Sequence, residues 1–535
     1  MKKTLLSSAV CISVSMALAL GMVGCKGTKK SSQADIKLTT DGSYPMKTDV
    51  ELRIWQNYFT PTATLNSMND SHFKTYLEEA TGVKLKYEHP PVGSQDAFTV
   101  MMASDDLPDI IISHWRSPEL DGYVDSNTLQ DLTPYIQAGA MPNLKKILDS
   151  DELIDKQTKL VSGRYIYSPM ILGDNILRSY RSYVIRQDLL DKAGLKQPET
   201  ISEWETVLAK FKEMGIEAPI TLQLGITAMG EAQFTNPFNF QGGFYLENGK
   251  VKCGYTDEGV KDWLATMKKW YDNGWLDHNF VDTSSTRISQ LITSGNCGAF
   301  YCNVGGGLGT YMNAVKKDSG IEFDAVKIPV KNNGDVPRFN QTQYKVHGVG
   351  AVISADCKNK EIAARFLDYG YSEAGQRTWN FGKEGVSYTM AKDENGNEYP
   401  KYTDIITDPA KRGEGVSMSQ ALSNYASTGN PISVQSKYYL LQVNNTPQQR
   451  KFLEYANTPD FDAYLLPPVL FTADENSAIN DKLTPISTYI DESIVKIITG
   501  KVDFEKGVAD YYSTIKKLGI DDITAEYQKA YEKTK

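Results

Sequence analysis

The sequence predicts a mixed α/β protein built from two lobes, and three observations support this. Segments with strand-like alternation are followed repeatedly by segments with helical periodicity, as in layered α/β lobes. The 535 residues exceed what one hydrophobic core usually supports, which favours two lobes or more. With 41% hydrophobic and 10% aromatic residues, the chain has an ordinary globular composition that can fill two cores.

The chain begins with the pattern of a secretory signal. Lys2 and Lys3 precede an apolar stretch, residues 5–20, which contains several serines and is followed by Gly21 and Lys26. A membrane-spanning helix needs about 20 predominantly apolar residues, so cleavage is a better interpretation than a span. We therefore expect residues 1–24 to be a signal peptide.

The residues Met22-Val23-Gly24-Cys25 resemble a bacterial lipobox, in which small residues precede a cysteine whose thiol is acylated. We expect Cys25 to be lipidated and to hold the protein at the outer face of the cell membrane, with no other membrane contact. The alternative is an ordinary secretory signal with an incidental cysteine. Residues 25–44 are polar and lack apolar periodicity, which predicts a flexible tether.

Charge and cysteine usage exclude several classes of protein. The formal net charge is −9 and no basic run offsets it, so a nucleic-acid partner is not expected. Cys11 leaves with the signal, and the cysteines that remain beside Cys25 are too few for a disulfide scaffold. Cys297 and Cys302 are close enough to form a bridge, or they are free thiols. The scattered histidines show no metal-ligand spacing, so we expect neither a metal nor a cofactor.

The first lobe is predicted from strands and helices that alternate along the chain. Alternating apolar residues predict strands at residues 50–54 and 83–87, and the apolar run at residues 107–112 suits a buried parallel strand. Helical periodicity is found at residues 73–81 and 98–103.

The second lobe, and the segment that returns from it to the first lobe, are predicted in the same way. Helices are predicted at residues 203–213 and 260–273, and a strand at residues 298–303. The chain then forms a second apolar strand and an amphipathic helix, at residues 349–354 and 360–371. Near the C-terminus, isoleucines at helical spacing precede a glycine that is suited to end a helix: Ile486, Ile490, Ile494, Ile497 and Gly500.

Several motifs belong to a recognisable pattern when they are taken together. Besides the lipobox they are MMASDDLPDII at residues 101–111, IRQDLLDKAGL at 185–195 with PET at 198–200, AARFLDYGYS at 363–372 and NFGKEGVSY at 380–388. In this order and at these intervals the chain resembles extracellular solute-binding protein family 1, especially the long lipoproteins of Gram-positive cell surfaces that serve sugar importers.

The resemblance implies a two-lobed, periplasmic-binding-protein-like type II fold with a hinge and a ligand cleft between the lobes. It implies a binding protein rather than an enzyme, an oligosaccharide as ligand, and the transmembrane subunits of an ABC permease as partner. We expect lobe 1 to begin with residues 45–165, lobe 2 with residues 166–340, and residues 341–385 to form the return to lobe 1 and the hinge. Residues 386–535 are expected to pack mainly on lobe 2.

One departure from the family concerns calcium. Many long relatives carry a calcium-binding loop after the helix equivalent to residues 203–213. Residues 212–219 of this chain (KEMGIEAP) lack the alternating oxygen ligands that such a loop needs, so we predict no calcium there.

A saccharide site needs flat aromatic faces and planar hydrogen-bonding groups, and in α/β lobes ligands bind at the carboxyl ends of strands. Trp55 and Tyr58 follow the first predicted strand, and Trp115 and Arg116 follow the strand that ends at Ile112. We propose these four residues as ligand contacts. For Trp55 and Trp115 the alternative is packing in the core.

Further candidates precede or follow strands of the second lobe. Arg178, Tyr180 and Arg181 lie just before a predicted crossover strand, and the alternative is a solvated charged stretch. Tyr301 and Asn303 follow another strand, and the adjacent glycines lack the spacing of a dinucleotide fingerprint.

Residues 379–388 form the densest local cluster of candidates. We expect Trp379 to be a stacking platform, Glu384 to accept a hydroxyl or to structure its loop, and Asn380 and Tyr388 to contact ligand. The resemblance places this loop at the cleft. The other tryptophans lie in amphipathic helices or at their ends and are expected in the core: Trp204, Trp263, Trp270 and Trp275.

The sequence disfavours two other functions. An anchored polysaccharide-degrading enzyme needs paired carboxylates in a groove, and no motif in this chain singles out two. A mainly helical glycan-docking lipoprotein is disfavoured by the recurrent alternation of strands and helices.

Overall fold

The computed structural model describes residues 36–57, 65–91, 94, 96–115, 120–316, 318–413, 416–427 and 432–534. The predicted signal peptide and Cys25 lie outside these ranges, as do Tyr58 and Arg116. The predictions for these residues therefore remain predictions. None of the described helices combines the length and hydropathy needed to cross a membrane.

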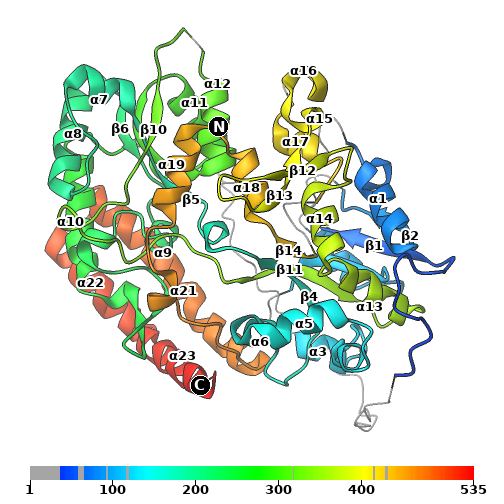
Figure 1. Ribbon diagram of the computed structural model, residues 1–535. Helices are drawn as coiled ribbons and strands as arrows, with labels where there is room; N and C mark the ends of the chain where they lie inside the picture. Colours follow the sequence, from blue (N-terminus) through cyan, green and yellow to red (C-terminus); the bar gives the residue numbers. More distant parts are fainter. Residues whose placement is uncertain are drawn as a thin grey trace, which may run out of the picture.

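Lobe 1 is built on a sheet that, in the described part of the chain, has the strand order β14-β4-β11-β3-β1-β2 (Figure 1). The strands are β1 (Glu51–Gln56), β2 (Lys84–Glu88), β3 (Ile110–His114), β4 (Tyr167–Leu172), β11 (Val346–Ile353) and β14 (Val434–Gln435). Strand β1 is parallel to β2 and β3, whereas β11 is antiparallel to β3 and β4. Leu52 and Ile54 are fully buried, as the predicted alternation requires.

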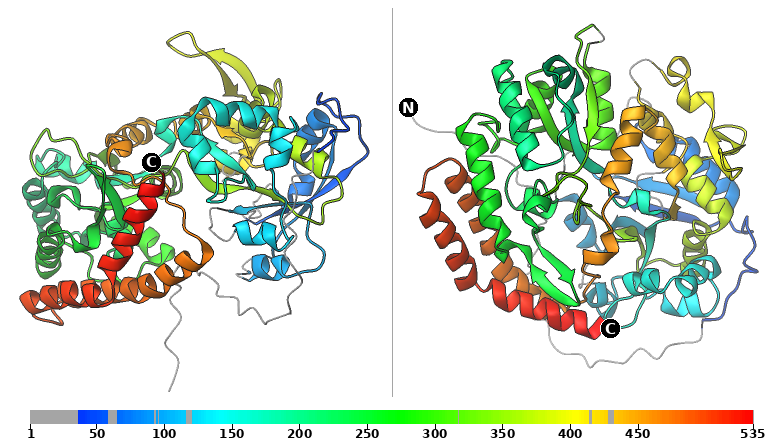
Figure 2. Two further views of the ribbon diagram at one scale, coloured as in Figure 1. Left: turned by 90° about the horizontal axis from the view of Figure 1, so that it is seen from below. Right: turned by 60° about the vertical axis from the view of Figure 1, so that its left-hand side comes forward.

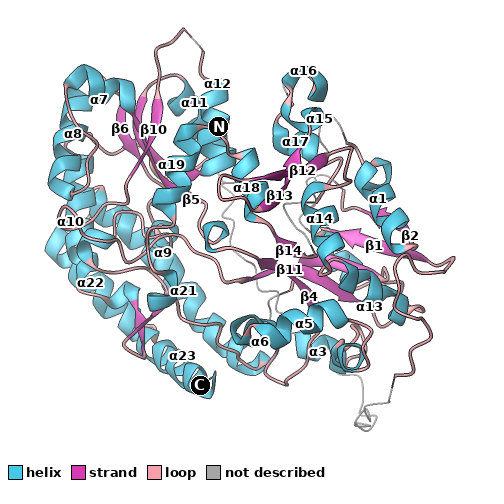
Figure 3. Cartoon of the chain, in the orientation of Figure 1, coloured by secondary structure: helices cyan, strands magenta, loops and turns pink. Residues whose placement is uncertain are grey.

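Helices pack around the sheet of lobe 1 (Figure 3). They are α1 (His72–Thr81), α2 (Ala97–Met102), α3 (Leu120–Asp125), α4 (Thr133–Gln137), α5 (Pro142–Ser150), α6 (Glu152–Thr158), α13 (Lys360–Tyr369) and α14 (Glu373–Phe381). Phe73 and Leu77 of α1 are buried on one face of the helix, at the spacing that predicted it.

Lobe 2 contains a second sheet with the order β10-β5-β9-β6 and a separate hairpin of β7 and β8. These strands are β5 (Arg181–Arg186), β6 (Ala218–Thr221), β7 (Phe244–Glu247), β8 (Lys250–Cys253), β9 (Cys297–Asn303) and β10 (Phe323–Val326). The first helices of the lobe are α7 (Gln187–Ala193), α8 (Ile201–Glu213), α9 (Ile226–Gly230), α10 (Gly259–Asp272), α11 (Ser285–Thr293) and α12 (Thr310–Ala314). Two sheets with their own helices confirm the predicted two-lobed α/β architecture.

The C-terminal helices complete lobe 2. After α18 (Lys437–Val443), which lies in the last crossing between the lobes, they are α19 (Pro447–Ala456), α20 (Phe461–Tyr464), α21 (Ala473–Ile498), α22 (Phe504–Lys517) and α23 (Ile520–Thr534). The long helix α21 runs along the lobe (Figure 2), where its isoleucines join a core with Trp204, Trp263 and Trp270. The core placement predicted for these tryptophans is confirmed. Helix α21 begins at Ala473, well before these isoleucines, where Thr472 and Glu475 form a capping box.

The chain passes between the lobes at residues 173–180, 327–345 and 436–446. Strand β4 belongs to the sheet of lobe 1, where it pairs with β11, so lobe 1 extends beyond the predicted boundary at residue 165.

The prediction that residues 386–535 pack mainly on lobe 2 needs a larger correction. The hairpin of β12 (Tyr388–Lys392) and β13 (Glu398–Tyr402) projects from the body of the molecule (Figure 2). With α15 (Asp404–Thr407), α16 (Pro409–Arg412) and α17 (Met418–Leu422), it forms a small core that includes Phe381 of α14. Strand β14 then pairs with β4 of lobe 1. Packing on lobe 2 is confined to the later helices.

The predicted tether is also shorter than expected. Residues 36–44 pack against α13: the hydroxyls of Thr39 and Thr40 donate to Glu361 at 2.7 and 2.6 Å. The Tyr44 hydroxyl donates to the carbonyl of Arg365 at 2.7 Å. These hydrogen bonds compensate for the lack of apolar periodicity, so the fold begins before residue 45.

Trp379 lies in the core of lobe 1 rather than on a ligand-facing surface. Its ring is 4% exposed and packs edge-on against Phe73, with 5.0 Å between ring centroids. A ring buried in this way has no free face for a sugar. The amphipathic pattern of α14 accounts for its position, because Thr378, Trp379 and Phe381 are all buried.

We predict that Trp379→Ala lowers the free energy of unfolding by about 3–5 kcal/mol, because it leaves a large cavity in the core. Urea denaturation followed by circular dichroism measures the change. Glu384→Gln, an exposed substitution in the loop that follows, is the matched control and should change stability by less than about 0.5 kcal/mol. A Trp379→Ala variant with unchanged stability but weakened ligand binding would restore the stacking role.

Candidate ligand-binding site

The two sheets present their strand ends to the same space between the lobes. The crossings leave lobe 1 at the carboxyl ends of β4 and β14 and enter lobe 2 at the amino end of β5. The carboxyl ends of β1 and β3 lie at that edge of lobe 1, and those of β6 and β9 at the matching edge of lobe 2. Ligands of α/β lobes bind at such edges.

On lobe 1 this edge is polar. The side chain of Asn57 donates to the Ser113 hydroxyl at 3.3 Å, and the exposed ring of His114 lies 6.3 Å from that of His347. A Cβ at Gly348 would lie 2.1 Å from Nε2 of His114, so only glycine leaves room for the imidazole across β11.

The two tryptophans predicted at this edge point into the core instead. Trp115 is 2% exposed, donates its indole N–H to the carbonyl of Ile111 at 3.0 Å and packs on Phe98. Trp55 is 9% exposed and belongs to the same core. The alternative stated from the sequence, packing in the core, therefore describes both residues.

Lobe 2 has a pocket of 150 Å³ at the carboxyl ends of β6 and β9. Tyr301 and Asn303, both predicted from the sequence, line it together with Arg181. The other lining residues are Thr221, Leu222, Gln223, Ser285, Ile288, Ile292, Phe300, Cys302, Gly306, Gly307 and Tyr311. Amide, hydroxyl and aromatic groups at one strand edge are suited to a polyhydroxylated ligand.

Hydrogen bonds hold the polar groups of this pocket in place. The guanidinium of Arg181 donates through Nε to Oδ1 of Asn303 at 2.6 Å and forms an ion pair with Glu231. Gln233 donates to the same Glu231 carboxylate at 3.1 Å. Burial raises the pKa of Glu231, and the adjacent Arg181 opposes part of that rise.

Glu231 was not predicted as a site residue. It follows the short helix α9, where no motif and no strand end marks it. The role of Glu231 is visible only in the folded structure, where its side chain binds Arg181 of β5 at the edge of the pocket.

A second cavity, of 400 Å³, is lined by both lobes. Lobe 1 contributes Leu160, Val161 and Tyr167, and residues 466–471 line the cavity from the side of lobe 2. Aromatic residues from several elements complete it: Phe244, Tyr344, Phe471 and Tyr527. Phe244 and Tyr527 stack with 4.0 Å between ring centroids. The sequence signal for this cavity is the apolar run LLPPVLF at residues 465–471, which has neither strand nor helix periodicity.

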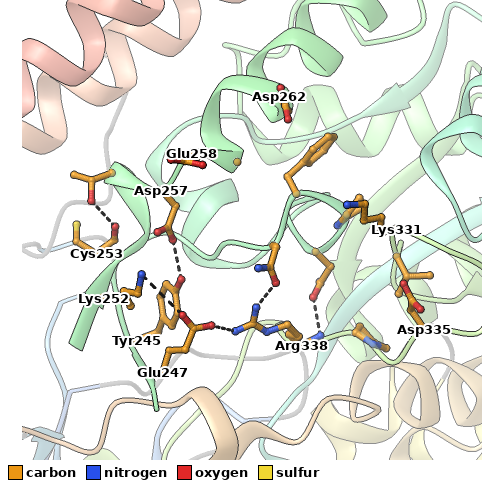
Figure 4. Close-up of a pocket in the computed structure, with 18 of the residues that line it drawn as sticks. Tyr245, Glu247, Lys252, Cys253, Asp257, Glu258, Asp262, Lys331, Asp335 and Arg338 are labelled. Carbon is orange, nitrogen blue, oxygen red and sulfur yellow. Dashed lines mark hydrogen bonds and ion pairs between the residues drawn. The ribbon is translucent and has the colours of Figure 1, made fainter. Parts of the chain in front are cut away.

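The largest pocket, of 1220 Å³, lies within lobe 2 (Figure 4). Some of its polar and charged residues pair with each other: Tyr245 donates to Asp257 at 2.8 Å, and Arg338 binds Glu247 at 2.5 Å. Its lining residues come from lobe 2 and the crossing at residues 327–345. None of its lining residues belongs to lobe 1 or lies at the carboxyl ends of β6 and β9, so we do not assign this pocket to the ligand.

Arg178 and Tyr180, which were also predicted as ligand contacts, lie in the first crossing between the lobes. Arg178 is 2% exposed; it donates to the carbonyl of Gln343 at 3.0 Å and to Asp462 at 2.8 Å. Tyr180 is half-buried and packs on an apolar cluster of lobe 2. Arg178 therefore ties crossings together and is not solvated, contrary to both sequence-based interpretations.

The cluster at residues 379–388 does not converge on one site. Asn380 is buried; its amide donates to the carbonyl of Val434 at 2.9 Å and accepts from the backbone of Ser436 at 2.9 Å. Tyr388 is buried against Phe381, whereas Glu384 is exposed. Asn380 thus anchors β14 and the start of the last crossing.

Neither cysteine pairing nor a metal cluster occurs in the described part of the chain. Cys297 and Cys302 are free thiols, so of the two alternatives the structure adopts the unbridged one. Within the described ranges no group of three or more His, Cys, Asp or Glu side chains is arranged to hold a metal ion.

The chain matches the family described as bacterial extracellular solute-binding protein over residues 60–377, more than half of its length, and it belongs to this family. Residues 469–534, which contain α21 to α23, match a domain of unknown function. The resemblance inferred from the sequence motifs is confirmed.

Two curated relatives come from Bacillus subtilis (strain 168). Lipoprotein LipO is 24% identical over 484 residues, covering 86% of this chain and 88% of the relative. The polygalacturonan/rhamnogalacturonan-binding protein YtcQ is 24% identical over 548 aligned positions, covering 97% of this chain and 98% of the relative.

Solved structures share the fold. The alginate-binding protein AlgQ2 without calcium ion has a TM-score of 0.69 at 23% identity, covering 91% of this chain and 99% of that one. The S. pneumoniae substrate-binding protein FusA in complex with kestose has a TM-score of 0.70 at 19% identity, covering 90% and 99%. An extracellular solute-binding protein from Bifidobacterium longum subsp. infantis reaches 0.71 at 16% identity, covering 91% and 98%. At these identities the likeness establishes the fold alone.

We predict that Asn340→Ala lowers the free energy of unfolding by about 1–3 kcal/mol, because it leaves buried carbonyl groups without a donor. The amide of Asn340 donates to the carbonyls of Arg181 and Ala456, each at 2.9 Å. Urea denaturation measures the loss. Asn332→Ala, at an exposed position of the same crossing, is the control; equal effects of the two substitutions would contradict the structural role of Asn340.

Proposed function

We propose that the chain is the lipid-anchored substrate-binding component of an ABC importer, which captures an oligosaccharide between its lobes and delivers it to a membrane permease. The observation that supports this most directly is that binding surfaces come from both lobes. Aromatic residues line a cavity to which both lobes contribute, and polar residues line a separate pocket at the carboxyl ends of β6 and β9. The proposed location is the outer face of the cell membrane.

A saccharide fits the chemistry of these surfaces. Aromatic faces cover the apolar faces of sugar rings, and the amides of Gln223 and Asn303 suit paired hydroxyls. Several relatives are named for saccharides: YtcQ for polygalacturonan and rhamnogalacturonan, AlgQ2 for alginate, and FusA was solved with kestose. We extend this class of ligand, and not any one saccharide, to the present chain.

The proposed mechanism is a shift between open and closed arrangements of the lobes. A ligand that contacts both lobes binds the closed arrangement more tightly, and only this difference in affinity can move the population. The closed form would then dock on the transmembrane subunits of the permease. Members of this family are binding proteins, so we propose that the ligand is released unaltered.

We predict that the purified protein binds at least one oligosaccharide and becomes more compact on binding. Isothermal titration against a panel of oligosaccharides gives the affinity, and small-angle scattering with saturating ligand gives the radius of gyration. Chromatography of the recovered ligand is the control for chemistry. A cleaved ligand would favour the polysaccharide-degrading alternative, and an unchanged radius would refute lobe closure.

We predict that Cys25→Ser releases the protein from the membrane into the medium, because the thiol that accepts the lipid is absent. Fractionation of cells that express the wild type and the variant measures this directly. The binding affinity of the released variant should equal that of the wild-type chain. Retention of the variant in the membrane fraction would contradict lipidation at Cys25.

A further inference from the structure

We infer that the ligand is an uncharged saccharide, and that Glu231 is the residue that excludes uronic acids. The inference rests on the function proposed above and narrows the class of ligand. It depends on how charge is distributed at the strand ends of lobe 2, where Arg181 and Glu231 form an ion pair beside the pocket.

Arg181 is the only charged residue among the described residues that line this pocket. An arginine at a binding edge is the side chain best suited to a carboxylate, because its planar fork donates two parallel hydrogen bonds. Alone, it would favour a uronic acid. The specificity of the pocket therefore depends on whether the guanidinium is free to bind a ligand.

The structure shows that the guanidinium is occupied. Its Nη1 contacts the carboxylate of Glu231, and its Nε donates to Asn303 at 2.6 Å. The side chains of Arg181 and Glu231 are 29% and 17% exposed, so the pair is partly shielded from water. A ligand carboxylate would have to displace Glu231 or lie beside it, and like charges in such a site repel.

Several other cations near the pocket and the hinge are paired as well. Behind the pocket, Arg287 binds Asp277 at 2.7 Å, and Asp277 also accepts from the Thr221 hydroxyl. In the crossings, Lys437 pairs with Asp174 at 3.1 Å and Lys345 with Asp151 at 3.1 Å.

The polar groups of this pocket that remain available to a ligand are uncharged. Gln223 offers an amide, and the half-buried Asn303 offers the Nδ2 side of its amide because Oδ1 accepts from Arg181. The Arg181–Glu231 pair taken together is neutral, and Arg181 held in this way contributes N–H groups in a fixed direction. Such a set recognises hydroxyl groups and gives no electrostatic preference for an acidic sugar.

The test compares two ligand classes on three proteins by isothermal titration. The neutral panel contains gluco-, manno-, xylo-, galacto- and fructo-oligosaccharides, and the acidic panel contains oligomers of galacturonate, mannuronate and guluronate. The proteins are the wild type, Glu231→Gln and the double variant Arg181→Gln/Glu231→Gln. Glu199→Gln, which removes an ion pair with Lys327 on the same lobe, is the matched control. Melting temperatures establish that each variant is folded.

The wild type should bind a neutral oligosaccharide and should bind every uronate oligomer at least about 100-fold more weakly, since the repulsion costs several kcal/mol. Glu231→Gln frees the guanidinium and should raise uronate affinity by about tenfold or more, given the strength of charge-assisted pairs. The double variant should lose this gain, and Glu199→Gln should leave both affinities unchanged.

The possible failures can be told apart. If the wild type binds uronates more tightly than every neutral ligand, the inference is overturned while the proposed function stands. If the wild type prefers neutral ligands but Glu231→Gln gains no uronate affinity, the role of Glu231 is refuted. If neither panel binds, the proposed function fails and the inference fails with it. The wild-type comparison decides the ligand class even if a variant does not fold.

Discussion

The arrangement of the two lobes depends on a few buried polar side chains where the chain passes between them. The amide of Asn340, 2% exposed, donates to the carbonyls of Arg181 and Ala456, and its Oδ1 accepts from the Tyr301 hydroxyl at 3.1 Å. Three segments that are far apart in the sequence are thereby joined at one amide. Buried polar groups are costly unless they are satisfied, so this network fixes how the crossings enter lobe 2. Arg178 ties the first two crossings in the same way through Gln343 and Asp462.

Much of the fold could be predicted because its signals are local. The apolar run before His114, the alternation of β1 and the helical faces of α1 and α8 each specify an element within a few residues. The tryptophans of α8 and α10 also lie where their helical spacing predicted. Strand β14 was not predicted, because two residues have no periodicity and the strand exists only through its pairing with β4.

The site was predicted less completely, for a related physical reason. A strand-end rule predicted Tyr301 and Asn303, which line the pocket of lobe 2, but it cannot tell which way a side chain turns after the strand. Trp115 points into the core, because its indole N–H donates to the carbonyl of Ile111 and its ring packs against Phe98. Glu231 was missed because its importance comes from a partner about fifty positions earlier in the chain. Ion pairing at the candidate site is a tertiary property, which no local pattern in the sequence reveals.

Under the anchoring proposed above, the attachment of residues 36–44 to α13 would hold lobe 1 nearer the membrane than lobe 2. With Cys25 as the anchor proposed above, the chain between that residue and Ile36 cannot reach farther than about 40 Å even when fully extended. Lobe 1 would then be fixed relative to the membrane, because Thr39, Thr40 and Tyr44 bind it to the anchored segment. Lobe 2 would be the lobe that moves about the hinge. The ligand would then be presented to the membrane from a fixed side. The short segment between Cys25 and Ile36 would limit the number of orientations that a transporter has to recognise.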